Sequence, residues 1–153
     1  QANGRYLTQH LAEIPGVEPP AEPEGCEHVF YNYPIRFKPE QVGVDMPARQ
    51  FREKVSAALN AEGVDVRQWW GIALPDMVLF QSRDGYGKGC PWSCPHTRQD
   101  ISYANLPLPE TRRWLDEYAL IRNLYAPNDL NVMEKYVTAF RKVFAQLSRV
   151  LQA

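Results

Sequence analysis

The stretch that decides the fold class is His28-Val-Phe-Tyr-Asn-Tyr-Pro-Ile-Arg-Phe-Lys38, whose side chains alternate with the period of a strand. Residues two apart lie on the same face of a strand, so the pattern predicts a half-buried strand over residues 28–38. Pro34 has no backbone N–H, so we expect this strand to lie at a sheet edge or residue 34 to point away from a neighbour. Arg36 falls on the opposite face and can be a solvated edge charge. The face predicted to be buried carries Val29, Tyr31, Tyr33, Ile35 and Phe37.

The clearest helix of the chain follows this strand. Asp45 is predicted to cap its start, and Pro47 suits its first turn. Gly63 supplies the left-handed residue at which such a helix ends. The apolar face of this helix is formed by Phe51, Val55, Ala58 and Leu59.

The remaining elements complete a mixed pattern. Two further strands are predicted at residues 64–70 and 118–123, and two helices at 110–117 and 132–151. Residues 71–109 are rich in glycine and proline and are expected to be irregular. Loops of this length are usually either functional or disordered. This order predicts an α+β fold in which a small antiparallel sheet packs against helices.

Length and composition exclude several classes of protein. The chain has 153 residues, of which 44% are hydrophobic and 23% charged, as expected for about one globular domain. Its 17 basic and 18 acidic residues give a net charge of −1, so we expect neither a nucleic-acid nor a membrane partner. No apolar run approaches the roughly 20 residues of a membrane span. An odd count of three cysteines, with no apolar leader at the start, favours the reducing cytoplasm.

The first residues of the chain have the pattern of a helix without a start. Tyr6, Leu7, Leu11 and Ile14 recur at helical spacing, and Pro15-Gly16 ends the pattern. No capping residue and no initiator Met precede them. We therefore interpret residues 1–14 as the end of an interdomain helix and residues 15–153 as one domain of a longer protein.

Cysteine and histidine residues form a candidate zinc site in the sequence. Cys26-Glu-His28 and the later Cys90, Cys94 and His96 offer suitable ligands. The spacing within Cys26-x-His28 is too short for a typical zinc-ligand pair, and a strand, a helix and another strand separate the two groups. We therefore interpret Cys90 and Cys94 as loop thiols near one another. A redox role is disfavoured because Cys-x-x-x-Cys lacks the Cys-x-x-Cys spacing.

Two local motifs point to ligand binding. Gly85-Tyr-Gly87-Lys-Gly89 could cradle a phosphate with backbone N–H groups, but it lacks the order of known phosphate loops, so a mobile glycine-rich loop is favoured. In Arg67-Gln-Trp69-Trp70, consecutive tryptophans on a strand point to opposite faces, so at most one lies wholly in the core. The other would offer a flat apolar surface beside a guanidinium, which suits a sugar or a carboxylate; an ordinary core aromatic is the alternative.

The common catalytic signatures do not occur in this sequence. It contains no Gly-x-Ser-x-Gly, no His-Glu-x-x-His and no Gly-x-Gly-x-x-Gly after a strand. The three histidines have no evident carboxylate or nucleophile partner. Taken alone, the chain is not expected to contain a catalytic centre.

Several strings, in their order, resemble the C-terminal part of the DegT/DnrJ/StrS family of PLP-dependent sugar aminotransferases. Tyr6-Leu-Thr-Gln-His-Leu-Ala-Glu-Ile-Pro-Gly16 is similar to the family's interdomain helix and its stop, and residues 28–36 to its first small-domain strand. The helix at 49–63 with the following Val64-Asp-Val-Arg-Gln-Trp-Trp70 resembles the stretch placed next to the substrate. Ala139-Phe-Arg-Lys-Val143 resembles the closing helix. Residues 87–95 are closest to the branch acting on keto-sugars and cyclitols.

The resemblance implies the C-terminal domain of a fold-type I aminotransferase that shapes the substrate pocket without being catalytic alone. The Schiff-base lysine and most pyridoxal phosphate (PLP) ligands would belong to a large N-terminal domain, so no cofactor is expected on this chain. The implied partners are that domain, a small-molecule sugar substrate and a second copy in a homodimer. A separate sugar- or nucleotide-sugar-binding module derived from such a domain is the alternative. The implied substrate-binding residues are Arg67, Trp69, Trp70, Lys88 and Trp92.

Overall fold

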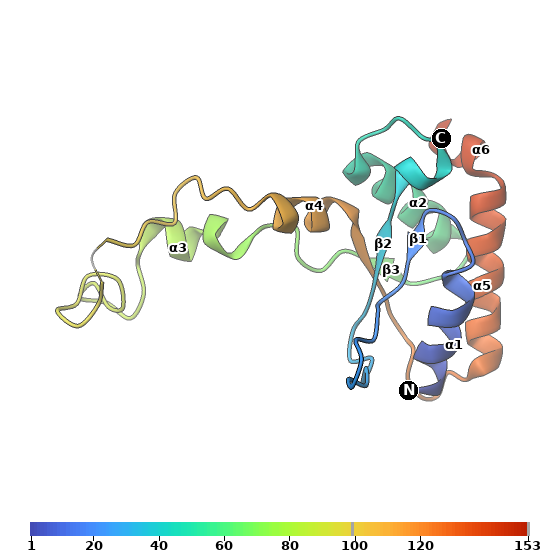
Figure 1. Cartoon of the computed structure of the whole chain (residues 1–153), viewed down its shortest axis with the longest axis horizontal. Helices are drawn as coiled ribbons and strands as arrows, with labels where there is room; N and C mark the ends of the chain where they lie inside the picture. The colour runs from blue at the N-terminus through green and yellow to red at the C-terminus, as the bar shows by residue number, and fades with distance from the viewer. Residues whose placement is uncertain (99, 153) are drawn as a thin grey trace. The chain divides into compact units, whose positions relative to one another are not determined.

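The computed structural model describes residues 1–98 and 100–152 and divides the chain into two compact units (Figure 1). The first unit consists of Gln1–Trp69 together with the chain from Asp116 onward. The second unit is Trp70–Leu115.

The first unit is built on a four-stranded antiparallel sheet. Its strands are β1 (Val17–Glu18), β2 (Tyr33–Phe37), β3 (Val66–Arg67) and β4 (Tyr118–Ile121), in the order β1-β2-β4-β3. β4 is buried along its whole length and pairs with both β2 and β3. Together with the helices of the described residues, this sheet confirms the predicted α+β class.

Helices cover one face of this sheet (Figure 1). They are α1 (Ala2–Leu11), α2 (Ala48–Ala61), α5 (Leu130–Ala145) and α6 (Leu147–Gln152), and a 3-10 turn, η1 (Pro39–Val42), precedes α2. Among the described residues, no helix is both long enough and apolar enough to span a bilayer. The core between helices and sheet includes Leu7, Leu11, Ile35, Phe37, Phe51, Val55, Leu59, Ala119, Ile121, Met133, Val137 and Phe140.

The alternation predicted for β2 is present over its five residues, with Tyr33, Ile35 and Phe37 buried. The N–H of Lys38 donates to the carbonyl of Gly16 at 2.9 Å, so even-numbered residues of this segment direct their N–H groups toward β1. β1 pairs with Arg36 and Phe37 alone, and Pro34 lies beyond its end. The missing N–H of Pro34 therefore faces no strand, as predicted.

The prediction of a strand over residues 28–38 is wrong in its first half. Phe30 adopts a left-handed backbone with φ of 54°, which interrupts the extended chain. Its neighbours Val29 and Tyr31 are 72% and 81% exposed, so the assignment of both to the core is corrected. The strand begins only at Tyr33, where pairing with Ile121 of β4 starts.

Other boundaries also shift from the predictions. α2 begins at Ala48 with Pro47 at its N-cap, so Asp45 is not the capping residue; Gly63, with φ of 91°, ends it as predicted. The strand predicted at 64–70 shortens to two residues, because its tryptophans lie outside the pairing with β4. The final helix divides at Gln146. The two-residue strand β1, just after Pro15-Gly16, was not predicted.

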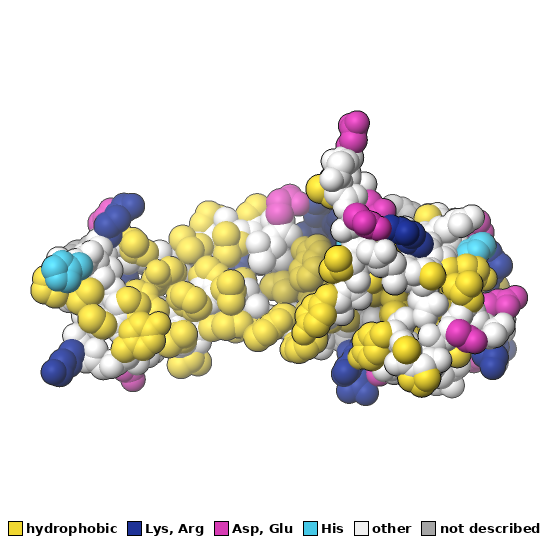
Figure 2. Space-filling view, turned by 90° about the horizontal axis from the view of Figure 1, so that it is seen from below, with side chains coloured by type: hydrophobic (Ala, Val, Ile, Leu, Met, Phe, Trp, Pro, Cys, Tyr) yellow, Lys and Arg dark blue, Asp and Glu magenta, His cyan; other side chains and the backbone are white. Residues whose placement is uncertain are grey.

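The second unit contains little regular structure. It holds a 3-10 turn, η2 (Leu74–Asp76), a short helix, α3 (Val78–Ser82), and most of α4 (Pro109–Glu117). Phe80 packs against Trp92 and Tyr103 with ring centroids 6.1 and 5.3 Å apart. Figure 2 shows hydrophobic side chains spread over this unit, on the left of that view. Its exposed large apolar residues include Ile72, Leu74, Val78, Leu79, Tyr86, Ile101 and Trp114.

A charged network occupies the sheet face opposite the helices. The buried Glu117 accepts from Lys38 Nζ at 2.8 Å and from Arg36 Nη2 at 2.6 Å. Arg36 also donates through Nη1 to Glu18 at 2.9 Å. Arg36 is therefore an ion-paired residue that joins β1, β2 and the start of β4, and it is not a solvated edge charge.

Replacing Glu117 with alanine is expected to lower the free energy of unfolding by about 3 kcal/mol, because two cations lose their buried counter-charge. Urea unfolding monitored by circular dichroism measures this change. Glu13→Ala is the matched control, since it removes an exposed ion pair with Arg141 and should cost less than about 1 kcal/mol. Equal losses in the two variants would contradict a stabilising role for the network.

Candidate functional site

A groove of about 480 Å³ lies in the first unit where β2 begins and β4 ends. Three segments line it: residues 29–33, Trp69, and residues 120–125. Its exposed apolar side chains are Val29, Tyr31, Trp69 and Tyr125. We call this feature the aromatic groove.

Phe30 anchors the first of these segments. Its ring lies directly against Gly4 of α1, where an added Cβ would come within 2.4 Å of the ring. The ring also stacks on Tyr33 and contacts the His28 ring in a tilted arrangement. The backbone N–H of Phe30 donates to His28 Nδ1 at 2.8 Å. Because Phe30 turns inward with a left-handed backbone, the flanking Val29 and Tyr31 are directed to solvent.

The segment after β4 is held by side-chain amides. Asn3 of α1 donates from Nδ2 to the carbonyls of Leu124 at 2.7 Å and Asn128 at 3.0 Å. Asn128 in turn donates to the carbonyl of Asn123, which has a left-handed backbone. These bonds fix the turn that carries Tyr125, which is 62% exposed.

Asp65 connects β3 to the same turn. Its carboxylate accepts from Arg67 Nε at 2.6 Å and from Asn123 Nδ2 at 3.3 Å. Its carbonyl accepts the N–H of Arg122 at 2.9 Å. Asp65 therefore orients one guanidinium and one amide beside the groove.

The predicted site residues fall in both units. Trp69 lines the aromatic groove with 59% of its surface exposed, and Arg67 flanks the groove opposite Leu120 in the sheet register. Trp70, Lys88 and Trp92 belong to the second unit. Of the five predicted residues, Arg67 and Trp69 therefore lie in the unit that contains the groove, and Trp69 lines it.

Within the second unit, Lys88 and Trp92 have different surroundings. Trp92 is half-buried, with its ring edge-on to Phe80. Lys88 is exposed and has a left-handed backbone with φ of 51°. Trp92 is therefore a packing residue of this unit, whereas Lys88 is open to solvent.

The glycines at 85–89 serve the packing of a tight turn. A Cβ at Gly85 would lie 2.4 Å from the carbonyl oxygen of Cys90, and one at Gly89 would lie 1.8 Å from Ser93 Oγ. The N–H groups of Tyr86, Cys90 and Ser93 donate to carbonyls of the turn itself. The close approaches at Gly85 and Gly89 favour a structural role for these two glycines.

The part of the chain that the structure describes holds no group of three or more His, Cys, Asp or Glu side chains that could bind a metal. Of the five lysines, Lys38 and Lys142 are ion-paired. None of the five lines the aromatic groove.

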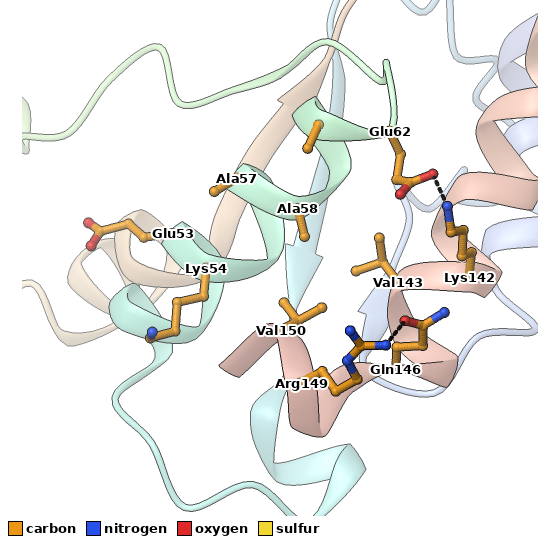
Figure 3. A pocket seen from close by; sticks show the side chains of 11 residues that line it. Glu53, Lys54, Ala57, Ala58, Glu62, Lys142, Val143, Gln146, Arg149 and Val150 are labelled. Carbon is orange, nitrogen blue, oxygen red and sulfur yellow. Dashed lines mark hydrogen bonds and ion pairs between the residues drawn. The ribbon is translucent and has the colours of Figure 1, made fainter. Parts of the chain in front are cut away.

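A second groove of about 820 Å³ lies between α2 and the α5–α6 helices (Figure 3). Lys142 Nζ bonds to Glu62 Oε2 across it at 2.7 Å, as Figure 3 shows, and Arg149 donates to Gln146. Its apolar lining consists largely of small side chains, such as Ala57 and Ala58. Since it offers small apolar side chains and no aromatic ring, this groove suits a sugar ring less well than the aromatic groove does.

Sequence reasoning missed most of the groove-lining residues. Tyr31 was assigned to the core, because the alternation of its segment extends through Phe30 without any sign of a left-handed residue. Residues after β4 carry no motif. Asn123 was a weak signal of a turn after this strand, since Asn adopts left-handed backbones more readily than most residues. The missed polar and aromatic residues are Tyr31, Asn32, Arg122, Asn123 and Tyr125.

Gly4→Ala should displace the ring of Phe30, because the added methyl group would overlap it. We expect a loss of about 1–3 kcal/mol in unfolding free energy, together with NMR shifts at residues 28–33. Gln9→Ala, an exposed position of α1, is the control and should leave those resonances in place. Unchanged resonances in Gly4→Ala would show that the segment does not depend on this contact.

Comparison with known proteins identifies no family for this chain. No family model matches the sequence, and the search of curated proteins finds no match. The resemblance to sugar aminotransferases therefore rests on the quoted strings. The function has to be argued from the geometry and chemistry of the aromatic groove.

Proposed function

We propose that the aromatic groove binds a sugar or cyclitol, and that the chain acts as the C-terminal small domain of a PLP-dependent aminotransferase for a keto-sugar or keto-cyclitol. The observation that carries the proposal is the exposed indole of Trp69 in a groove that also holds two asparagines and Arg122. Binding and orienting the substrate would be the contribution of this chain.

The groove has the mixture of groups that a sugar requires. An aromatic ring offers a flat apolar face for the C–H side of a pyranose or cyclitol ring, and its polarised surface favours such contacts. The amides of Asn32 and Asn123 can both donate to and accept from hydroxyl groups. The guanidinium of Arg122 adds a partner for a phosphate or carboxylate. The volume of the aromatic groove also falls within the range of small-molecule sites.

The chemical step would belong to the partner domain. When bound there, PLP supplies the electron sink of transamination, and the protein contributes orientation and electrostatics. On this chain, Trp69 would align the ring of the substrate and Tyr31 and Tyr125 would exclude water from its edges. Asp65 would keep Arg67 and Asn123 in place by the bonds described above.

The surface of the second unit supports a protein partner. Contiguous apolar surface is unfavourable in water, and this unit exposes several large apolar side chains. The family resemblance suggests the large N-terminal domain and a second copy of this chain as the partners. Trp70 and Lys88, which the resemblance assigns to substrate binding, lie in this unit.

A separate sugar- or nucleotide-sugar-binding module remains the second candidate. It is favoured by one observation: every residue that lines the aromatic groove belongs to the first unit. Sugar binding would then require no other domain and no PLP.

Trp69→Ala is expected to weaken sugar binding at least tenfold, which corresponds to about 1.4 kcal/mol of lost stacking. Calorimetric titration with UDP-N-acetylglucosamine and with myo-inositol measures this for the nucleotide-sugar and cyclitol classes. Leu130→Ala, an exposed apolar position outside the groove, is the control and should bind as the parent does. Equal affinity of Trp69→Ala and the parent would contradict the assignment of the groove.

The two candidate functions predict different behaviour in the protein as its native source produces it. If this chain is the small domain of an aminotransferase, the native protein should be a larger chain that shows the absorbance of bound PLP. In that enzyme, Trp69→Ala and Arg67→Ala should raise KM or lower kcat for the sugar without changing this absorbance. Unchanged KM and kcat in both variants would exclude these residues from substrate binding. Sugar binding without any transamination by that protein would favour the separate module.

A further inference from the structure

The aromatic groove carries a single charge. Arg122 is the one charged residue among the described residues that line it, and neither an aspartate nor a glutamate belongs to that lining. The other polar side chains of the lining are those of asparagine and tyrosine, which are uncharged at pH 7. A ligand in the groove therefore meets one positive charge and no negative charge that would repel an anion.

Arg122 also differs from the other arginines of the chain. Within the part of the chain that the structure describes, its guanidinium makes no hydrogen bond and no ion pair. The side chains of the other 11 arginines each donate to a carboxylate, a side-chain amide or a backbone carbonyl. Because Arg122 is exposed, water can solvate its guanidinium until a ligand fills the groove.

Asp65 is the acidic residue bonded to the backbone of Arg122, and its carboxylate has other partners. The N–H of Arg122 donates to the carbonyl of Asp65 at 2.9 Å. The Asp65 carboxylate accepts from Arg67 Nε at 2.6 Å and from Asn123 Nδ2 at 3.3 Å. The charge of Arg67 is therefore already compensated by an ion pair beside the groove, whereas the charge of Arg122 is available to a ligand.

We propose that the ligand of the aromatic groove is a sugar acid, a hexuronate whose carboxylate binds the guanidinium of Arg122; this inference rests on the proposed function of the groove. A ligand that fills the groove takes water away from Arg122, and a desolvated charge is costly unless a counter-charge replaces the water. A neutral sugar would leave this cost unmet. A carboxylate meets it, because its two oxygens match the planar fork of a guanidinium.

The number of charges favours a carboxylate over a phosphate. A phosphate monoester carries a charge of about −1.5 to −2 near pH 7. A carboxylate carries −1, which one guanidinium compensates. Among the described residues, no lysine lines the groove to compensate a second charge. Trp69 would bind the C–H face of the pyranose ring and Arg122 its carboxylate, so the two contacts act on different parts of the ligand.

The test is an NMR titration of the full chain at pH 7 and low salt with glucuronate, glucuronamide, glucose and glucose 6-phosphate. These sugars differ in one substituent of the same ring. The backbone N–H resonances of Tyr31 and Asn123, two lining residues, report occupation of the groove. Glucuronate should bind at least about tenfold more tightly than glucose or glucuronamide, because charge-assisted hydrogen bonds are the stronger ones. It should also bind more tightly than glucose 6-phosphate.

Variants of Arg122 test which residue recognises the acid. Arg122→Gln should remove the preference for glucuronate and leave the affinity for glucose unchanged. Arg122→Lys should keep only part of the preference, because an ammonium group cannot form the paired bonds of a guanidinium. Arg149→Gln, at an exposed position of α6 outside the groove, is the control and should keep the full preference. A preference that survives in Arg122→Gln, or tighter binding of glucose 6-phosphate to the parent, overturns the inference.

Trp69→Ala separates a failure of this inference from a failure of the proposed function. If the parent binds glucose and glucuronate equally well and Trp69→Ala weakens both, the groove binds sugars and the assignment of an acid is wrong. If Trp69→Ala binds these sugars as the parent does, or the parent binds none of them, the groove is not a sugar site and the inference fails with the proposed function. Support for both requires that Trp69→Ala weakens both sugars and that Arg122→Gln weakens glucuronate alone.

Discussion

The pairing of β4 with both β2 and β3 is the interaction on which the first unit depends. β4 is buried along its length, so its backbone groups need partners on both edges and its side chains need cover on both faces. Helices α1, α2 and α5 cover the face that carries Ala119 and Ile121. The same pairing brings the ends of three strands together, and the aromatic groove forms where they meet.

The two faces of the sheet are stabilised by different physical means. One face contacts a continuous apolar core, whereas the other carries the network of Glu18, Arg36, Lys38 and Glu117. Glu117 directly precedes β4, so its carboxylate is placed by the strand that organises the sheet. The network joins β1, β2 and the residue before β4, so it links the three segments across this face of the sheet.

Local patterns predicted the parts of the chain whose structure depends on nearby residues. The alternation over residues 33–37, the apolar face of α2, the stop at Gly63 and the stripe of α5 all correspond to observed elements. The prediction failed at Tyr31, since a contact of Phe30 with Gly4, far away in sequence, turns that segment out of the strand. The strand predicted at residues 64–70 also fails to reach Trp70, because only Val66 and Arg67 of that segment pair with β4.

By itself, the sequence determined the class of the fold and that Trp69 and Trp70 cannot both lie in the core, because periodicity and adjacent large side chains act over a few residues. Only the tertiary structure decided which residues share a site. Tyr31, Trp69 and Tyr125 come from three distant segments, and long-range pairing and the amide of Asn3 bring them to one groove.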